Sequence, residues 1–260
     1  MIYATDLDRT IIFSNKFLDT CSEDVVCVEE VENKHISYMT FNSYNKLSEL
    51  KSKLNLKIIP ITTRSVNQFK RVKAVQDCEY AITSNGGTIL HNGEVFQPWQ
   101  QYVNTVINKY NEDFPYVLQM MNRFSELFEH EAKVVDGIFM FTKLKDNAED
   151  IDFFVTQMTI LLNLSKWNFT LQGRKFYIIP KEISKENALL YLKKYLKEDK
   201  LIVSGDGKLD IGFLSIGDVC IIPDGSEVLD YLPSKSFVYK SVPKGLSGTI
   251  DLFNIVEQNL

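Results

Sequence analysis

Two pairs of aspartates follow two apolar runs of the sequence, and together they could bind a cation. Asp6 and Asp8 come directly after an apolar run at the N-terminus, and Asp206 and Asp210 follow the run Leu201–Ser204. Aspartate is common in turns, so one such pair alone is weak evidence of a site. Two pairs after two strands favour a shared site, because the carboxyl ends of parallel strands line the ligand crevice of an open α/β sheet.

A cluster of carboxylates needs a cation or a proton to be stable. Two like charges about 4 Å apart repel each other by about 4 kcal/mol at an effective dielectric constant of 20. Mg²⁺ is the natural counter-ion, because it prefers oxygen ligands and is usually held by one or two carboxylates together with a substrate phosphate. The sequence therefore makes Mg²⁺ the candidate ion for a site among these aspartates.

A third apolar run, residues 58–61, ends in the polar stretch Thr62, Thr63, Arg64 and Ser65. Hydroxyls and backbone amides at a strand end and a helix start can hold phosphate oxygens, which makes the two threonines candidates for a phosphate site. The alternative is a helix cap, since Ser and Thr are favoured at that position.

Lys185 stands at the predicted start of a helix over residues 186–196. A single lysine at such a place is most often solvated, and the spacing alone does not assign it to a site. Both interpretations stay open at this point.

Short apolar runs that alternate with helical patterns predict the elements that position these residues. Their hydrophobicity is continuous, as in strands that are buried on both faces of a parallel sheet. Apolar residues at spacings of three and four indicate helices between them, so the chain is built of βαβ units. We predict the α/β class, with a doubly wound, Rossmann-like parallel-sheet core. The predicted strands are residues 2–5, 58–61, 80–83, 201–204, 219–222 and 237–239.

The middle of the chain predicts an inserted α+β domain. Helical stripes at 117–128 and 151–162 alternate with strand-like segments at 134–144 and 167–180. We therefore expect a discontinuous core of residues 1–97 and 180–260, interrupted by a second domain at 98–179. A hairpin with an Asn-Gly turn is predicted at 88–96. A second hairpin at 25–39 could form a flap over the end of the first strand.

The composition limits the classes of function. The chain has 260 residues, 45% hydrophobic, with 29 basic and 34 acidic side chains and a net charge of -5. This is an ordinary globular composition, and the length allows one large domain or one domain with a sizeable insertion. Nucleic acids and anionic membranes would need a concentrated basic patch, which the sequence lacks. No segment reads as a signal peptide or a membrane span, so we expect a cytoplasmic protein. The four cysteines form no CxxC pair, which disfavours zinc.

The motifs in this order resemble the haloacid dehalogenase (HAD) superfamily of phosphohydrolases, and the resemblance covers nearly the whole chain. The position of the insertion, between the second and third motifs, is similar to the Cof-type branch with its type-two cap. Residues 98–179 would then be the cap. The four motifs are matched in order by Asp6, Asp8 and Thr10; by Thr62; by Lys185; and by Asp206 and Asp210.

The resemblance implies a Mg²⁺-dependent phosphomonoester hydrolase. Asp6 would attack phosphorus and form an aspartyl-phosphate, and Asp8 would act as acid and then as base. Thr62, Thr63 and Lys185 would bind the phosphoryl group. The implied metal ligands are Asp6, the backbone carbonyl of Asp8, and Asp206, with Asp210 supporting the water shell.

The substrate implied is a small phosphorylated metabolite, with sugar phosphates favoured, and the expected state is a monomer or weak dimer. Two alternatives stay open: a phosphotransferase or mutase that uses the same intermediate, and a ligand sensor without activity. The sequence departs from the branch at Leu209, where Asn is common, and at Thr63, where Gly is frequent. The segment between the first two motifs is also longer than usual, and the predicted flap accounts for it.

Overall fold

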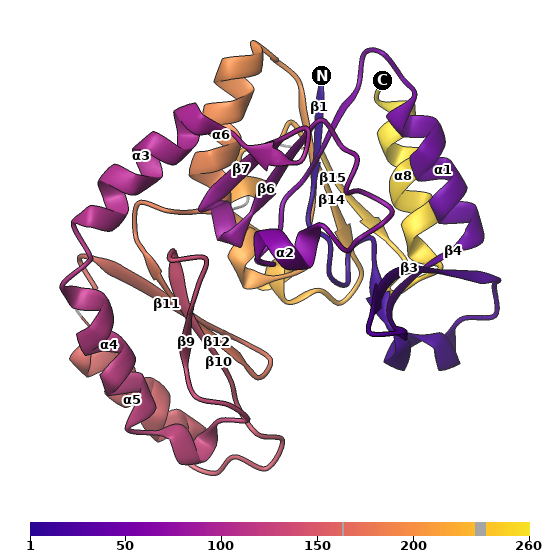
Figure 1. The fold of residues 1–260 in the computed structure, drawn as a ribbon. Coiled ribbons are helices and arrows are strands. Elements are labelled where there is room, and N and C mark those ends of the chain that lie inside the picture. The colour runs from indigo at the N-terminus through magenta and orange to yellow at the C-terminus, as the bar shows by residue number, and fades with distance from the viewer. Residues whose placement is uncertain (163, 232–237) are drawn as a thin grey trace. The chain divides into compact units, whose positions relative to one another are not determined.

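The computed structural model describes residues 1–162, 164–231 and 238–260, and these form two compact units (Figure 1). The first unit joins Met1–Phe96 to Lys185–Leu260, and the second is Gln97–Ser184. Phe237, the first residue of the strand predicted at 237–239, lies outside the described residues.

A five-stranded, wholly parallel sheet forms the centre of the first unit. Its central strands are apolar and buried, as continuous hydrophobic runs predict for a sheet that is covered on both faces. The predicted fold class is therefore confirmed. In spatial order the strands are β15 (Val238–Val242), β14 (Val219–Pro223), β13 (Leu201–Ser204), β1 (Ile2–Thr5) and β5 (Lys57–Pro60).

One predicted strand does not belong to this sheet. The run at 80–83 forms β6 (Tyr80–Thr83), which pairs antiparallel with β7 (Thr88–His91), and β8 (Glu94–Val95) completes a separate three-stranded sheet. A single parallel bridge between Ile61 and Ile82 links this small sheet to the segment that follows β5. The apolar run showed that a strand is present but not which strand it pairs with.

Helices lie on both sides of the parallel sheet, with α1 and α8 packed together on one side and α6 on the other (Figure 1). Helix α1 is capped by Thr40, whose side chain accepts a hydrogen bond from the backbone N–H of Ser43. The predicted stripe of α1 is correct at Leu47 and Leu50 but wrong at Leu54, which lies beyond the helix end and is fully exposed. The α-helices of this unit are α1 (Phe41–Lys51), α2 (Val66–Phe69), α6 (Lys185–Leu196), α7 (Ile211–Leu214) and α8 (Gly248–Gln258).

The hairpin predicted at 25–39 is present as β3 (Val25–Val31) and β4 (Lys34–Thr40), and β2 (Phe13–Ser14) pairs with the far side of β4. The pairing of β3 with β4 shifts register on both sides of Glu29, so that this residue sits in a bulge opposite Ser37. Bulges re-aim side chains and are frequent beside active sites.

The second unit is an α+β layer with a four-stranded antiparallel sheet. The segment 134–144, predicted as a single strand, is two strands joined by a turn at Asp136 and Gly137, both at positive φ (49° and 72°). The helical stripe at 117–128 also ends early, because α4 stops at Asn122. In spatial order the strands are β11 (Trp167–Gln172), β12 (Lys175–Pro180), β10 (Phe139–Lys143) and β9 (Lys133–Val135). The helices are α3 (Gln97–Asn108), α4 (Asp113–Asn122) and α5 (Ile151–Leu161).

Short 3₁₀ turns complete the described part of the chain, and two of them, η2 and η4, carry residues of the candidate active site. The turns are η1 (Asn15–Thr20), η2 (Ser84–Gly86), η3 (Ser125–Leu127), η4 (Lys208–Asp210) and η5 (Glu227–Asp230).

Candidate active site

The neighbouring strands β1 and β13 end side by side and deliver the first aspartates to one place. Thr5 and Ser204, the last residues of the two strands, are paired in register, and the Ser204 hydroxyl donates to the Thr5 hydroxyl at 2.8 Å. The backbone N–H of Asp6 donates to the Ser204 carbonyl at 2.9 Å. These buried hydrogen bonds fix the point at which Asp6 and Asp206 leave the sheet.

Lys185 lies between two aspartates and is not solvated. Its ammonium donates to Oδ1 of Asp6 at 2.6 Å and to Oδ1 of Asp210 at 2.7 Å, and the residue is 3% exposed. Burial alone lowers the pKa of this lysine, but the carboxylates of Asp210 and Asp6 together raise it above its usual range. Lys185 therefore stays charged and balances the two carboxylates.

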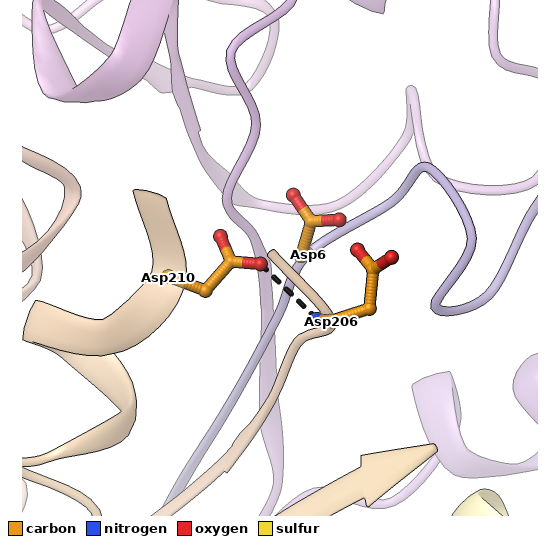
Figure 2. Close-up of side chains that lie close together, drawn as sticks. All are labelled: Asp6, Asp206 and Asp210. Atoms are coloured by element: carbon orange, nitrogen blue, oxygen red, sulfur yellow. Dashed lines mark hydrogen bonds between the residues drawn. The ribbon is translucent and has the colours of Figure 1, made fainter. Parts of the chain in front are cut away.

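Asp210 is oriented by the loop that precedes it. Its Oδ2 accepts hydrogen bonds from the backbone N–H groups of Asp206 (3.1 Å) and Gly207 (2.9 Å). Gly205 makes this close turn possible, because a Cβ added there would lie 2.9 Å from Cβ of Asp210. The loop thus turns Asp210 toward Lys185 and leaves the Asp206 side chain beside Asp6 (Figure 2).

The three aspartates could hold a metal ion. Asp6, Asp206 and Asp210 each offer one carboxylate oxygen, and these oxygens lie within 4.8 Å of one another. Burial, followed by the neighbouring Asp210 carboxylate, raises the pKa of Asp6 well above its usual range and that of Asp206 to about 7. A divalent cation would relieve this repulsion, and an all-oxygen set of ligands fits Mg²⁺.

Thr62 follows β5 and is held by its neighbours. It is 1% exposed, its N–H donates to the Ile82 carbonyl at 2.9 Å, and its carbonyl accepts from the N–H of Asn85 at 3.0 Å. Its hydroxyl oxygen accepts from the backbone N–H of Arg64 at 3.1 Å, so the hydroxyl hydrogen remains able to donate. Thr63 comes next and is partly buried. Ser65 is the N-cap of α2 in a capping box, so the cap interpretation is correct for this residue.

Asp8 forms an ion pair with an arginine that was not predicted from the sequence as a site residue. Nε and Nη2 of Arg64 donate to Oδ2 and Oδ1 of Asp8, each at 2.8 Å. Such a bidentate pair fixes the carboxylate in one plane. The motif positions gave no reason to join these residues, because Arg64 follows a different strand.

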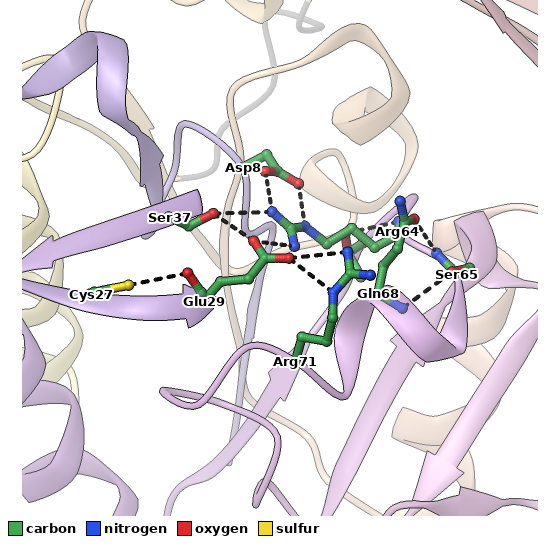
Figure 3. A network of polar contacts seen from close by, with 9 residues as sticks. Asp8, Cys27, Glu29, Ser37, Arg64, Ser65, Gln68 and Arg71 are labelled. Carbon is green, nitrogen blue, oxygen red and sulfur yellow. Dashed lines mark hydrogen bonds and ion pairs between the residues drawn. The ribbon is translucent and has the colours of Figure 1, made fainter. Parts of the chain in front are cut away.

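A buried glutamate from the hairpin β3–β4 holds the other side of Arg64 (Figure 3). Nη1 of Arg64 lies 2.8 Å from Oε2 of Glu29, a residue that is 1% exposed. The Ser37 hydroxyl donates to the same oxygen at 2.6 Å, and Arg71 lies 3.3 Å from Oε1. Glu29 was not among the residues predicted from the sequence, where its only signal was the hairpin predicted at 25–39 in a segment longer than usual for the resembled branch.

The loop after β6 is strained and supports Thr62. Ser84, Asn85 and Gly86 have φ values of 52°, 56° and 93° in succession. The first two are costly for residues with a side chain, at about 1–2 kcal/mol each. The N–H of Ser84 donates to the Arg64 carbonyl at 2.8 Å, so the strained loop is tied to the segment that carries both Thr62 and Arg64.

A cavity of about 390 Å³ opens beside Asp206. Its lining includes the cationic side chains of Arg9, Lys16 and Lys244 and the ring of Phe13. Positive charge around a carboxylate-rich site suits an anionic ligand.

The first unit therefore gathers residues from four separate segments of the chain. The side chains of Asp6, Asp206, Asp210 and Lys185 form one cluster, and Thr62 and Asp8 are connected through Arg64. In the part of the chain that the structure describes, no helix combines the length and apolarity needed to span a bilayer.

Comparison with known proteins gives a family and a fold. The profile of the family described as sucrose-6F-phosphate phosphohydrolase matches residues 1–229. No curated protein sequence matches the chain.

Solved structures resemble the whole chain at low sequence identity. A sucrose-phosphatase from Synechocystis sp. PCC6803, in complex with sucrose and phosphate, has a TM-score of 0.67 at 17% identity, covering 100% of this chain and 98% of that one. A haloacid dehalogenase-like hydrolase from B. subtilis has a TM-score of 0.60 at 12% identity, covering 97% and 98%. A HAD-superfamily phosphatase from Bacteroides thetaiotaomicron has a TM-score of 0.60 at 14% identity, covering 99% and 94%. At these identities the likeness shows a shared fold.

Proposed function

Because the chain belongs to the sucrose-6F-phosphate phosphohydrolase family of the HAD superfamily, and is thus a HAD-type phosphatase, we propose that it hydrolyses a small phosphorylated metabolite, with sugar phosphates as the favoured class. The resemblance of the sequence to the HAD superfamily is thereby confirmed. The observation that carries the proposal is the buried contact of Lys185 with both Asp6 and Asp210. The sugar class is supported by the sucrose-phosphatase that shares the fold.

The proposed reaction has two steps. A carboxylate oxygen of Asp6 attacks phosphorus, the bond to the leaving oxygen breaks, and Asp8 gives its proton to that oxygen. Water then attacks the aspartyl-phosphate, passes a proton to Asp8, and releases inorganic phosphate, which restores Asp6. The second step regenerates both carboxyl groups, so the cycle needs no further reactant.

The surrounding residues hold the phosphoryl group and its charge. Lys185 offsets negative charge on Asp6 and on the transferring phosphoryl group, at a place where burial strengthens the attraction. Thr62 has a hydroxyl hydrogen left to donate to a phosphoryl oxygen, and Thr63 is proposed to contribute beside it. Asp8 enters this scheme already oriented by Arg64.

We propose Mg²⁺ as the cofactor. Asp6, Asp206 and the backbone carbonyl of Asp8 would hold it, with Asp210 supporting its water shell, and the acidic cluster of Figure 2 supports this assignment. When bound, the ion supplies neutralisation of carboxylate and phosphoryl charge. The proposed catalytic core is residues 1–97 and 180–260, and the proposed cap is 98–179, an assignment that rests on the two units of the fold.

Release of inorganic phosphate from a panel of phosphomonoesters tests the proposal. We expect wild-type protein with Mg²⁺ to hydrolyse sugar phosphates faster than nucleotides or phosphoamino acids, and EDTA to abolish the activity. Asp6→Asn should lose it as well, and Asp77→Asn, an exposed carboxyl on the same unit, is the matched control. Activity that persists in Asp6→Asn would contradict the assignment of Asp6 as the nucleophile.

The same panel separates the alternatives. A mutase or phosphotransferase would move phosphate to a sugar acceptor and release little of it, and a sensor would bind the sugar phosphates without turnover. Either result would replace hydrolysis as the function of this site.

A further inference from the structure

We propose that Glu29, in the hairpin β3–β4, is a positioning residue for Asp8 and acts through Arg64. The inference rests on the proposed role of Asp8 as the acid that protonates the leaving group. It assigns to the hairpin a part in the reaction that the catalytic motifs do not contain.

The contacts form a chain of three charged groups. On one edge of the Arg64 guanidinium group, Nε and Nη2 donate to the two carboxylate oxygens of Asp8, each at 2.8 Å. On the other side of the group, Nη1 lies 2.8 Å from Oε2 of Glu29. Because the guanidinium group is planar and rigid, fixing one of its sides fixes the other. The place of Glu29 therefore sets the plane in which the Asp8 carboxylate lies.

Glu29 is well suited to be the fixed end of this chain. It is 1% exposed, and its oxygens are met by Arg64, by the Ser37 hydroxyl at 2.6 Å and by Arg71 at 3.3 Å. A carboxylate this deeply buried stays only where its oxygens have partners. The bulge in β3 turns its side chain inward, and a bridge between Glu29 and Val72 joins the bulge to the chain after α2.

Asp8 needs such a support more than its neighbours do. Its side chain is 43% exposed, whereas that of Asp6 is 9% exposed and is held by Lys185 and Thr10. An acid must point at the leaving oxygen, and small errors of placement cost about 10²-fold in rate. Arg64 and Glu29 supply the constraint that burial supplies to Asp6.

Leaving groups that differ in their need for a proton give the test. The ratio kcat/KM reports the step in which the leaving group departs. In that step the alkoxide of an alkyl phosphate needs a proton from the acid, whereas 4-nitrophenyl phosphate releases 4-nitrophenolate, a stable anion that needs none. We expect Glu29→Gln, which keeps the shape and removes the charge, to lower kcat/KM for the best alkyl phosphate by about 10-fold. For 4-nitrophenyl phosphate the loss should stay within about 2-fold. Asp8→Asn removes the acid itself and should lower kcat/KM for the alkyl phosphate by about 10²- to 10⁴-fold, again with a much smaller loss for 4-nitrophenyl phosphate.

Two further variants separate positioning from folding. Lys73→Met removes an exposed cation from the neighbouring Glu30 but no contact of Glu29, so the ratio of the two kcat/KM values should stay at the wild-type value. Ser37→Ala removes one hydrogen bond to Glu29 and should show the selective loss at about 3-fold, even if Glu29→Gln does not fold.

The results distinguish the positioning role of Glu29 from the proposed function. Equal losses on both substrates in Glu29→Gln and Ser37→Ala, or no loss on either, would overturn the positioning role while leaving the phosphatase in place. Wild-type protein that releases phosphate from neither substrate would overturn the proposed function itself.

Discussion

Two cations each join two carboxylates in the first unit, and they do so in different ways. Lys185 is 3% exposed and sits between Asp6 and Asp210, with single contacts of 2.6 and 2.7 Å. The side chain of Arg64 is 13% exposed and lies between Asp8 and Glu29, with a two-point contact to Asp8. Lysine is a point charge, and arginine is a planar fork.

The difference separates charge balance from orientation. Asp6 is buried and already fixed by its strand, so it needs a counter-charge, which Lys185 gives. Asp8 is partly exposed and needs a fixed direction, which the fork of Arg64 gives. The Lys185 contacts join residues that belong to motifs, whereas the Arg64 contacts depend on a hairpin outside them. Variants on each side of this division should therefore behave differently.

Loss of the charge at Lys185 should have the largest effect. Lys185→Met leaves Asp6 and Asp210 facing each other without a cation, and kcat should fall by about 10²- to 10³-fold, as when a preorganised donor is removed. Lys194→Met, at an exposed lysine of the same helix, should have wild-type kcat. A kcat for Lys185→Met within about 3-fold of wild type would show that the charge balance is not needed.

The stability of the metal-free protein should fall as the pH rises from about 4 to about 7. Asp206 has a pKa of about 7 in the folded protein and an ordinary value of 3.8. As the pH rises, the unfolded chain therefore loses this proton before the folded protein does. The free energy of unfolding falls across that interval, and the decrease is complete above pH 7. Thermal unfolding in EDTA should show a falling Tm, and Asp206→Asn should reduce the slope, with Asp6, whose pKa is also raised, supplying the rest.

Mg²⁺ supplies the control for this prediction. An ion that binds only the folded state raises Tm, and it must displace the Asp206 proton to do so. The stabilisation by Mg²⁺ should therefore be larger at pH 7.5 than at pH 5. A metal-free Tm that increases from pH 4 to 7 would contradict the expected direction of the pH dependence.

Removal of Arg64 should cost more stability than removal of Arg71. Arg64→Met leaves the buried Glu29 without its nearest cation, and the free energy of unfolding should fall by about 3 kcal/mol. Arg71 is 39% exposed on its side chain, so Arg71→Met should cost at most about 1 kcal/mol. Urea unfolding measures both, and equal losses would show that Glu29 depends on its two arginines alike.

Ion pairs in the second unit should contribute least to the stability of the protein. Glu129 pairs with Lys143 at 2.7 Å and with Arg174 at 2.5 Å, and these contacts lower its pKa. Solvent screens such pairs, so Glu129→Gln should leave Tm unchanged within error. A clear drop in Tm, measured beside Glu131→Gln as an exposed control, would mean that this pair is structural.

Features that depend on adjacent residues could be predicted from the sequence. The strands Ile2–Thr5 and Leu201–Ser204 were predicted with the bounds that they have, because a run of apolar residues buried on both faces is a local signal. The aspartates that follow were placed for the same reason. Their convergence followed from the rule that parallel strands present their carboxyl ends at one edge.

Features that depend on pairing between distant residues could not be predicted. An apolar run does not name its partner strand, so the run at 80–83 was assigned to the wrong sheet. Glu29 is one of two adjacent glutamates in β3, and a shift of register with β4 turns its side chain inward. The sequence of β3 alone does not show that shift. Turn residues at Asp136 and Gly137 were visible in the sequence, but the apolar residues around them outweighed the signal.

The most direct test of the proposed mechanism is the search for phosphate on Asp6. Wild-type protein mixed with Mg²⁺ and a ³²P-labelled sugar phosphate, then quenched in acid within milliseconds, should carry label that peptide mapping places on Asp6. Asp6→Asn should carry none, and Asp8→Asn should accumulate more than wild type from 4-nitrophenyl phosphate, because the water step lacks its base. Label on another residue, or label retained in Asp6→Asn, would contradict the site as assigned.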